Sequence, residues 1–207
     1  MSKLIPALGV LGAGGATGLG IAISNSLSSG ETIKDKLSQE GFSILEENRS
    51  EWGEILKSYK DNKNTWKFKK EHSGISDEIQ TESSLKQVCK AILKLDSSIS
   101  EIYKSATKWC VVPRKAEEFV SGLLDVNESN TNDTEAWKHN VDGYKATKKG
   151  NENKYEWSDV TFSGSEDTKN LKVGCKTRRG KLTYDVEFDS AINELKKWCL
   201  AKKTQEG

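Results

Sequence analysis

Several residues and motifs on which protein chemistry depends are scarce or missing in this sequence. Only two histidines occur, His72 and His139, which leaves little room for histidine-based catalysis or metal binding. The four cysteines form no C-x-x-C pair, so neither a structural zinc site nor a thioredoxin-type redox centre is expected. Phosphate-binding loops, nucleophile motifs and zinc-binding helix motifs are absent as well. We therefore predict that the chain is not an enzyme and has no catalytic residue, no metal and no cofactor.

An excess of charge of one sign is also missing. The 32 Lys and Arg residues nearly balance the 31 Asp and Glu residues, which leaves a net charge of +1. So small a charge creates no global field that would steer the protein to nucleic acid or to a membrane surface. The stretch Thr65–Lys70 does interleave aromatic residues with lysines, as surfaces that bind single strands do. Its neighbouring helical segments are acidic, so we interpret it as a solvated loop and expect no nucleic-acid partner.

The N-terminal segment differs in composition from the rest of the chain. Residues 4–23 contain no charged side chain and follow Lys3. A helix of about 20 residues can cross the ~30 Å hydrocarbon core of a bilayer. We predict a transmembrane anchor or signal segment over residues 1–24, a linker over residues 25–30, and the membrane as the partner of residues 4–23.

Details of this segment leave its role open. The spacing Gly14-x-x-x-Gly18 is typical of helices that pack closely within membranes. Ala22-Ile23-Ser24 has the small-x-small form of a signal-peptide cleavage site. A third interpretation is a dinucleotide-binding turn, based on the glycines from Gly12 to Gly18. That turn requires a βαβ unit, and a polar linker follows instead, so we expect no nucleotide.

A twelve-residue apolar pattern that occurs twice is the main architectural signal. Its members recur at the three- and four-residue spacings that place side chains on one face of an α-helix. The first copy consists of Ile99, Ile102, Tyr103, Ala106, Trp109 and Cys110, and the second of Phe188, Ala191, Ile192, Leu195, Trp198 and Cys199. Each copy ends in Trp-Cys, and an Asp-Ser pair lies just inside or before it (Asp96-Ser97 and Asp189-Ser190).

Further matches flank the two copies in the same order. A Trp and a Tyr at helical spacing come first, and a Leu-x-x-x-Cys motif follows them in each half of the chain. This order indicates an internal duplication, with helical repeat 1 over residues 31–112 and helical repeat 2, including a C-terminal tail, over residues 113–207. The aromatic residues expected to form the structural core are Trp52, Tyr59, Trp109, Trp137, Tyr144 and Trp198.

The predicted fold class is mainly α: an N-terminal membrane segment followed by two related helical halves. Glu31–Leu45 has an amphipathic pattern with a break at Gly41, and Pro113–Leu124 is expected to form another helix. The second half is less purely helical. Lys154–Ser163 and Leu182–Phe188 alternate apolar and polar residues, which indicates a short β-ribbon there.

The four cysteines lie on or beside the apolar stripes. Four buried thiols are one interpretation, because cysteine is often buried. The other is one disulfide in each repeat, Cys89–Cys110 and Cys175–Cys199, which the duplication favours among the three pairings that four cysteines allow. Neighbouring antiparallel helices would bring each pair within reach, and export would place the chain where disulfides persist.

Three features together resemble a known group of sequences. They are the apolar, glycine-rich start after Met-Ser-Lys, the stretch TIKDKLSQEGF at Thr32–Phe42 followed by Trp52, and WCVVP at Trp109–Pro113. In these features, and over most of its length, the chain resembles the large paralogous families of uncharacterised proteins of haemotropic mycoplasmas. The resemblance implies a surface or membrane-associated protein of a wall-less bacterium that lives on red blood cells. Roles proposed for such families are antigenic variation and host contact, and no activity, cofactor or catalytic residue is implied.

We therefore expect a non-enzymatic, membrane-anchored surface protein. It would reside at the cell membrane with its C-terminal domain outside the cell. Its partners would be host surface molecules or antibodies. The alternatives are an intracellular helical module for protein interaction and an enzyme of unrecognised type.

Overall fold

The computed structural model describes residues 30–69, 79–149, 155–162 and 164–201. The predicted anchor over residues 1–24, and all of the linker except Gly30, lie outside the described residues. Within the described part of the chain, no helix is both long enough and apolar enough to cross a membrane.

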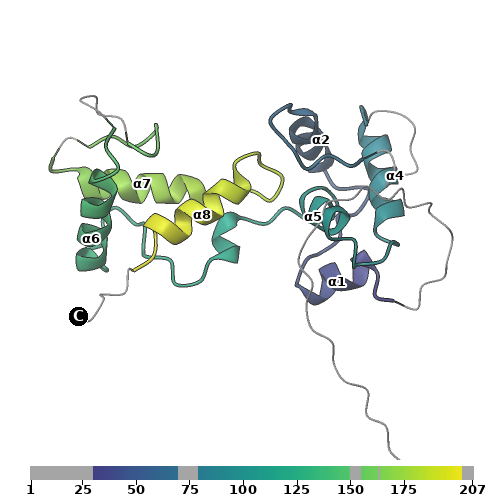
Figure 1. Ribbon diagram of the computed structural model, residues 1–207, viewed down its shortest axis with the longest axis horizontal. Helices are drawn as coiled ribbons and strands as arrows, with labels where there is room; N and C mark the ends of the chain where they lie inside the picture. The colour runs from purple at the N-terminus through teal and green to yellow at the C-terminus, as the bar shows by residue number, and fades with distance from the viewer. Residues whose placement is uncertain (1–29, 70–78, 150–154, 163, 202–207) are drawn as a thin grey trace, which may run out of the picture.

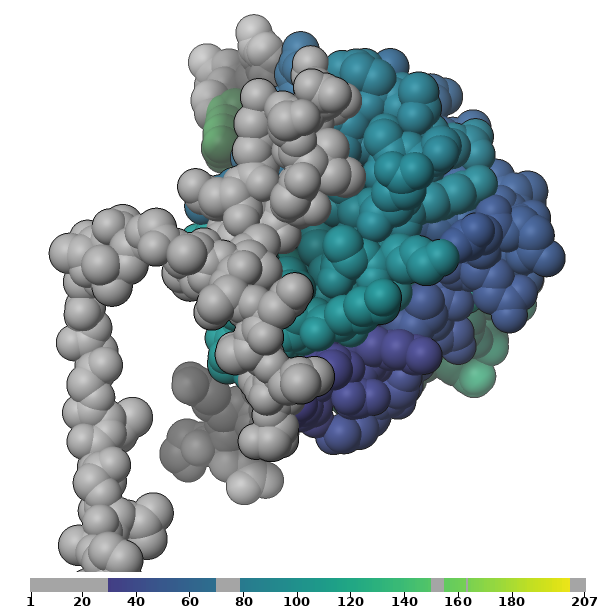
Figure 2. Space-filling model, turned by 90° about the vertical axis from the view of Figure 1, so that its right-hand side faces the viewer, coloured from purple at the N-terminus to yellow at the C-terminus, as the bar shows by residue number. Residues whose placement is uncertain are grey.

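The described residues are mainly helical, as predicted. The N-terminal helices are α1 (Ile33–Gln39), α2 (Trp52–Lys60), α4 (Glu82–Ile92) and α5 (Ser100–Trp109). The C-terminal ones are the 3-10 helix η1 (Ala116–Phe119), α6 (Thr134–Lys145), α7 (Asp167–Arg179) and α8 (Phe188–Trp198). Figure 1 shows these two groups as bodies placed end to end and joined by the chain between α5 and η1. Viewed from the end of the first group, most of the second lies hidden behind it (Figure 2).

Each group of helices encloses its own hydrophobic core. The buried residues of the first core run from Ile33 to Val111, and those of the second from Ala116 to Cys199. We call the two bodies the first half and the second half. All six aromatic residues expected in the core are buried: Trp52, Tyr59, Trp109, Trp137, Tyr144 and Trp198.

Local sequence signals account for both ends of α1. The Thr32 side chain accepts a hydrogen bond from the backbone N–H of Asp35, and the Asp35 carboxylate accepts one from the Thr32 N–H. This reciprocal capping satisfies donors that a helix start otherwise leaves without partners. α1 then ends before Gly41, whose φ of +78° suits glycine and no bulky residue. The break predicted from Gly41 is therefore present.

The predicted β-ribbon is wrong for the described parts of Lys154–Ser163 and Leu182–Phe188, which contain no strand. In the first segment, side chains that were expected to alternate between two faces instead enter one core: Trp157, Val160 and Phe162 are all buried. In the second, the Asp185 carboxylate accepts the Leu182 N–H at 2.8 Å and closes a turn.

The helix predicted over Pro113–Leu124 is reduced to the short η1. The residues beside η1 pair with other segments, since Lys115 forms an isolated bridge with Leu182 and Leu123 forms one with Leu200. Gly122, at φ +75°, turns the chain between them. The apolar spacing was helical, but long-range backbone pairing decided the conformation.

Candidate functional site

Two buried disulfides are the chemically distinctive feature of the described structure. Cys89, within α4, bonds to Cys110, which caps the C-terminus of α5, with 5.4 Å between the two Cα atoms. Cys175, within α7, bonds to Cys199, which caps the C-terminus of α8, with 5.9 Å between the Cα atoms. No cysteine is left free. The prediction of one disulfide in each half is confirmed, and that of four buried thiols is wrong.

A tyrosine–tryptophan pair lies in the core of each half. The rings of Tyr59 and Trp109 meet edge to face with centroids 5.1 Å apart, and those of Tyr144 and Trp198 do the same at 5.1 Å. Such pairs contribute about 0.5–1.5 kcal/mol beyond the area they bury. Each pair joins the second helix of its half to the helix that ends in the disulfide.

The tyrosine hydroxyl groups fix the loops that follow. Tyr59 Oη accepts the backbone N–H of Phe68 at 3.0 Å, and Tyr144 Oη accepts that of Trp157 at 2.6 Å. Phe68 and Trp157 therefore hold corresponding places in the two halves. Burial raises the pKa of Tyr144 to about 12, so this hydroxyl stays protonated at neutral pH.

Backbone contacts around the disulfides correspond as well. The Leu45 N–H donates to the Cys110 carbonyl at 3.0 Å, and the Leu124 N–H donates to the Cys199 carbonyl at 2.9 Å. The four isolated bridges form two matching pairs: Thr32 with Asp96 and Ile44 with Val111, then Lys115 with Leu182 and Leu123 with Leu200. The two Asp-Ser pairs do not correspond, because Asp96 precedes α5 whereas Asp189 lies in the first turn of α8.

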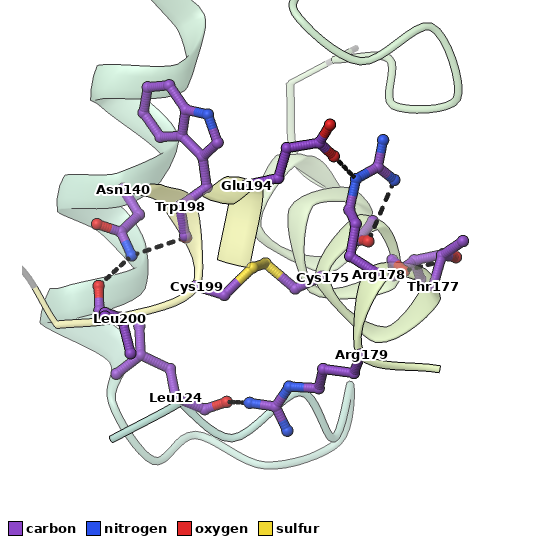
Figure 3. Close-up of a disulfide and its surroundings, with 12 residues drawn as sticks. Leu124, Asn140, Cys175, Thr177, Arg178, Arg179, Glu194, Trp198, Cys199 and Leu200 are labelled. Atoms are coloured by element: carbon purple, nitrogen blue, oxygen red, sulfur yellow. Dashed lines mark hydrogen bonds and ion pairs between the residues drawn. A yellow bond between two sulfur atoms is a disulfide. The ribbon is translucent and has the colours of Figure 1, made fainter. Parts of the chain in front are cut away.

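Polar side chains surround the second disulfide (Figure 3). Asn140 is fully buried, and its amide donates to the carbonyls of Trp198 at 3.0 Å and Leu200 at 2.9 Å. These bonds hold the backbone on both sides of Cys199. Asn140 comes three residues after Trp137. At the same distance after Trp52, the first half has the buried Ile55.

Arg178 makes a second polar cluster beside the same disulfide. Its guanidinium binds Asp159 through two nitrogens at 2.7 and 2.9 Å and Glu194 at 2.6 Å, and it stacks 3.8 Å from the centre of the Trp157 ring. The hydrogen bonds from Arg178 lower the pKa of Asp159. Arg178 comes three residues after Cys175. At the same distance after Cys89, the first half has the buried Ile92.

The two halves touch at a junction centred on Lys108 of α5. Its side chain is 6% exposed, and its ammonium lies 3.1 Å from the Asp189 carboxylate of α8. Trp66 Nε1 donates to the same carboxylate at 2.9 Å, and Ser58 Oγ donates to the Tyr184 carbonyl at 2.5 Å. A cavity of about 260 Å³ lies here between aromatic residues of both halves. Of the two lysines that line the cavity, Lys108 already pairs with its carboxylate, Asp189, which makes the junction a structural contact.

Sequence reasoning missed the polar residues of these clusters. Lys108, Asn140 and Arg178 look like surface residues in a linear sequence, and their partners are distant in the chain. One signal was available for Asn140, because it occupies the place of Ile55 when the two halves are aligned on Trp52 and Trp137.

Metal-binding side chains do not gather in the part of the chain that the structure describes. There, no cluster of three or more His, Cys, Asp or Glu residues could hold a metal ion. The site that the structure brings together is a pair of disulfide-closed cores. Comparisons with known protein families, with curated proteins and with solved structures found no match to this chain.

Proposed function

We propose that the chain is an exported, non-enzymatic recognition protein, held at the cell membrane by residues 1–24 with its two halves outside the cell. The observation that carries the proposal is that all four cysteines are paired, one disulfide to each half. Disulfides persist in oxidising compartments and are rare in the cytosol, where thiols are kept reduced.

The position of the disulfides supports a role in preserving a binding surface. Each one ties the end of the last helix of its half to the middle of the preceding helix. The bonds close loops of 21 and 24 residues, and the chain entropy lost by the unfolded state then corresponds to about 3 kcal/mol of stabilisation each. A protein exposed outside the cell benefits from such bonds because unfolding would expose it to proteases.

We also propose that the two halves arose by duplication of one helical unit. The support is the set of matching contacts: the tyrosine–tryptophan pairs, the disulfides and the paired bridges. A surface protein built from two copies of one scaffold can vary its exposed residues in each copy while the core contacts are kept. This fits the roles in host contact and antigenic variation that the resemblance to families of haemotropic mycoplasmas implies.

Protease treatment of intact cells tests the location. Trypsin added outside should remove the full-length band, since lysines are abundant on both halves, while a cytosolic marker protein stays intact. Survival of the full-length protein in intact cells, with its loss after lysis, would place the chain inside and contradict the proposal.

A further inference from the structure

A groove on the first half carries positive charge and adjoins the junction, because Trp66 and Lys104 line both the groove and the junction cavity. It lies between residues 65–69 and α5, and its volume is about 360 Å³. Trp66 and Phe68, both half-buried, contribute aromatic surface. Lys67, Lys69 and Lys104 contribute three ammonium groups.

The described carboxylates compensate the positive charge of the groove only in part. Lys69 pairs with Glu101 at 2.9 Å. Lys67 and Lys104 form no ion pair with any residue that the structure describes, although the Lys104 ammonium lies 5.8 Å from the centre of the Trp66 ring. The groove therefore offers two lysines that no described carboxylate neutralises.

The second half shows that the fold does not require these lysines. Phe68 corresponds to Trp157 through the tyrosine hydrogen bond, and the helix ends Cys110 and Cys199 correspond through the disulfides. Counting from these fixed points, the positions of Lys67, Lys69 and Lys104 are taken in the second half by Glu156, Ser158 and Asn193. The same scaffold thus carries lysines at these three positions in one half and none at the corresponding positions of the other.

We propose that this groove binds an acidic polysaccharide, a chain of sugars that bears sulfate or carboxylate groups. The choice of ligand rests on the proposed location outside the cell. Lysine clusters are typical of surfaces that bind heparin-like polymers or nucleic acids. Lys104 and Lys108 both lie within about 6 Å of the Trp66 ring, which leaves little free ring face on which a nucleobase could stack.

The ammonium groups of Lys67 and Lys104 would meet the sulfate or carboxylate groups of the sugar chain. Glu101 lines the same groove, and its carboxylate already pairs with Lys69 at 2.9 Å.

Isothermal titration calorimetry tests the proposal. A heparin hexasaccharide is titrated into the oxidised full-length chain at low salt. The double variant Lys67→Glu with Lys104→Asn installs the residues of the second half and should weaken binding at least tenfold. The control Lys138→Glu with Lys196→Asn changes the net charge equally at exposed positions of the second half, and it should stay within twofold of the native protein. Thermal unfolding should be unchanged in both. The single exposed variant Lys104→Asn should weaken binding about threefold.

Three outcomes would overturn the proposal. One is heparin binding that the double variant leaves unchanged, and another is equal loss in the control, which would indicate attraction by net charge alone. The third is tighter binding of a single-stranded oligonucleotide or of polyglutamate at the same salt concentration. Failure of the polysaccharide-binding proposal is distinguishable from failure of the proposed export, because trypsin treatment of intact cells does not depend on any ligand.

Discussion

In the first half of the molecule, the buried Ile55 and Ile92 stand where the second half has the buried Asn140 and the half-buried Arg178. Both halves keep the same tyrosine–tryptophan pair, disulfide and backbone bridges. The two apolar residues need no partner, whereas Asn140 and Arg178 donate hydrogen bonds to neighbouring groups. The buried Oδ1 of Asn140 has no partner among the described residues. The aromatic–disulfide frame is therefore common to both halves, while the residues packed around it differ in polarity.

The size of the residue beneath the loop also differs between the halves. Gly174 lies under Trp157 in the second half. The corresponding residue of the first half is Val88, which belongs to the core against which the smaller Phe68 packs. Large and small residues thus exchange places while the interior stays filled, as close packing requires.

Loss of the core tryptophan should have the largest effect on stability in either half. Trp109→Ala and Trp198→Ala should each lower the free energy of unfolding by about 3–5 kcal/mol, because both side chains are almost fully buried. Denaturant titration measures this. The control Val173→Ala, at a side chain 41% exposed, should change it by less than about 0.5 kcal/mol. A silent substitution at either tryptophan would show that the two cores are not built alike.

Removal of one disulfide should lower the free energy of unfolding nearly as much as loss of a core tryptophan. The double variants Cys89→Ser with Cys110→Ser and Cys175→Ser with Cys199→Ser should each lose about 3 kcal/mol, because the closed loops are similar in length. Thermal unfolding of the two variants side by side shows whether their losses of stability are equal. A difference of more than about 2 kcal/mol between them would mean that the polar cluster of the second half alters the contribution of its disulfide.

Replacement of Gly174 by the valine of the first half should have an intermediate effect. A Cβ atom at this position would lie 2.5 Å from Val160 Cγ2 and 3.0 Å from the Trp157 ring. The resulting overpacking should cost about 1–3 kcal/mol. Adding Trp157→Phe, which restores the combination found in the first half, should recover part of that loss in a double-mutant cycle. Strictly additive losses would show that the two positions do not compensate each other.

Loss of the ion pair at the junction should have the smallest effect on the free energy of unfolding. Asp189→Asn removes the carboxylate that pairs with Lys108, and the expected loss is about 1 kcal/mol because the Asp189 side chain is 54% exposed. The control Asp142→Asn, at an exposed carboxylate of α6, should be neutral. Small-angle scattering should show a longer average shape for the junction variant. No change in shape would mean that other contacts, such as Ser58 with Tyr184, hold the halves in place.

The apolar spacing in the sequence predicted the helices and the residues on their inner faces because helical periodicity is a local property. It predicted the disulfide pairs because the same pattern occurred twice. It failed at Pro113–Leu124 and in the expected β-ribbon, where pairing with distant segments and a side-chain turn at Asp185 determine the backbone. The contacts of Lys108, Asn140 and Arg178 depend on which helices meet, which no local pattern specifies.

The pairing of cysteines in protein taken from the native cell is the most direct test of the account. Thiols are blocked with an alkylating agent at lysis, and the protein is digested without reduction and analysed by mass spectrometry. The account predicts one peptide pair linked through Cys89 and Cys110, another through Cys175 and Cys199, and no alkylated cysteine. Alkylation of all four cysteines would contradict the location outside the cell, and a link from Cys89 to Cys199 would contradict the two separately closed halves.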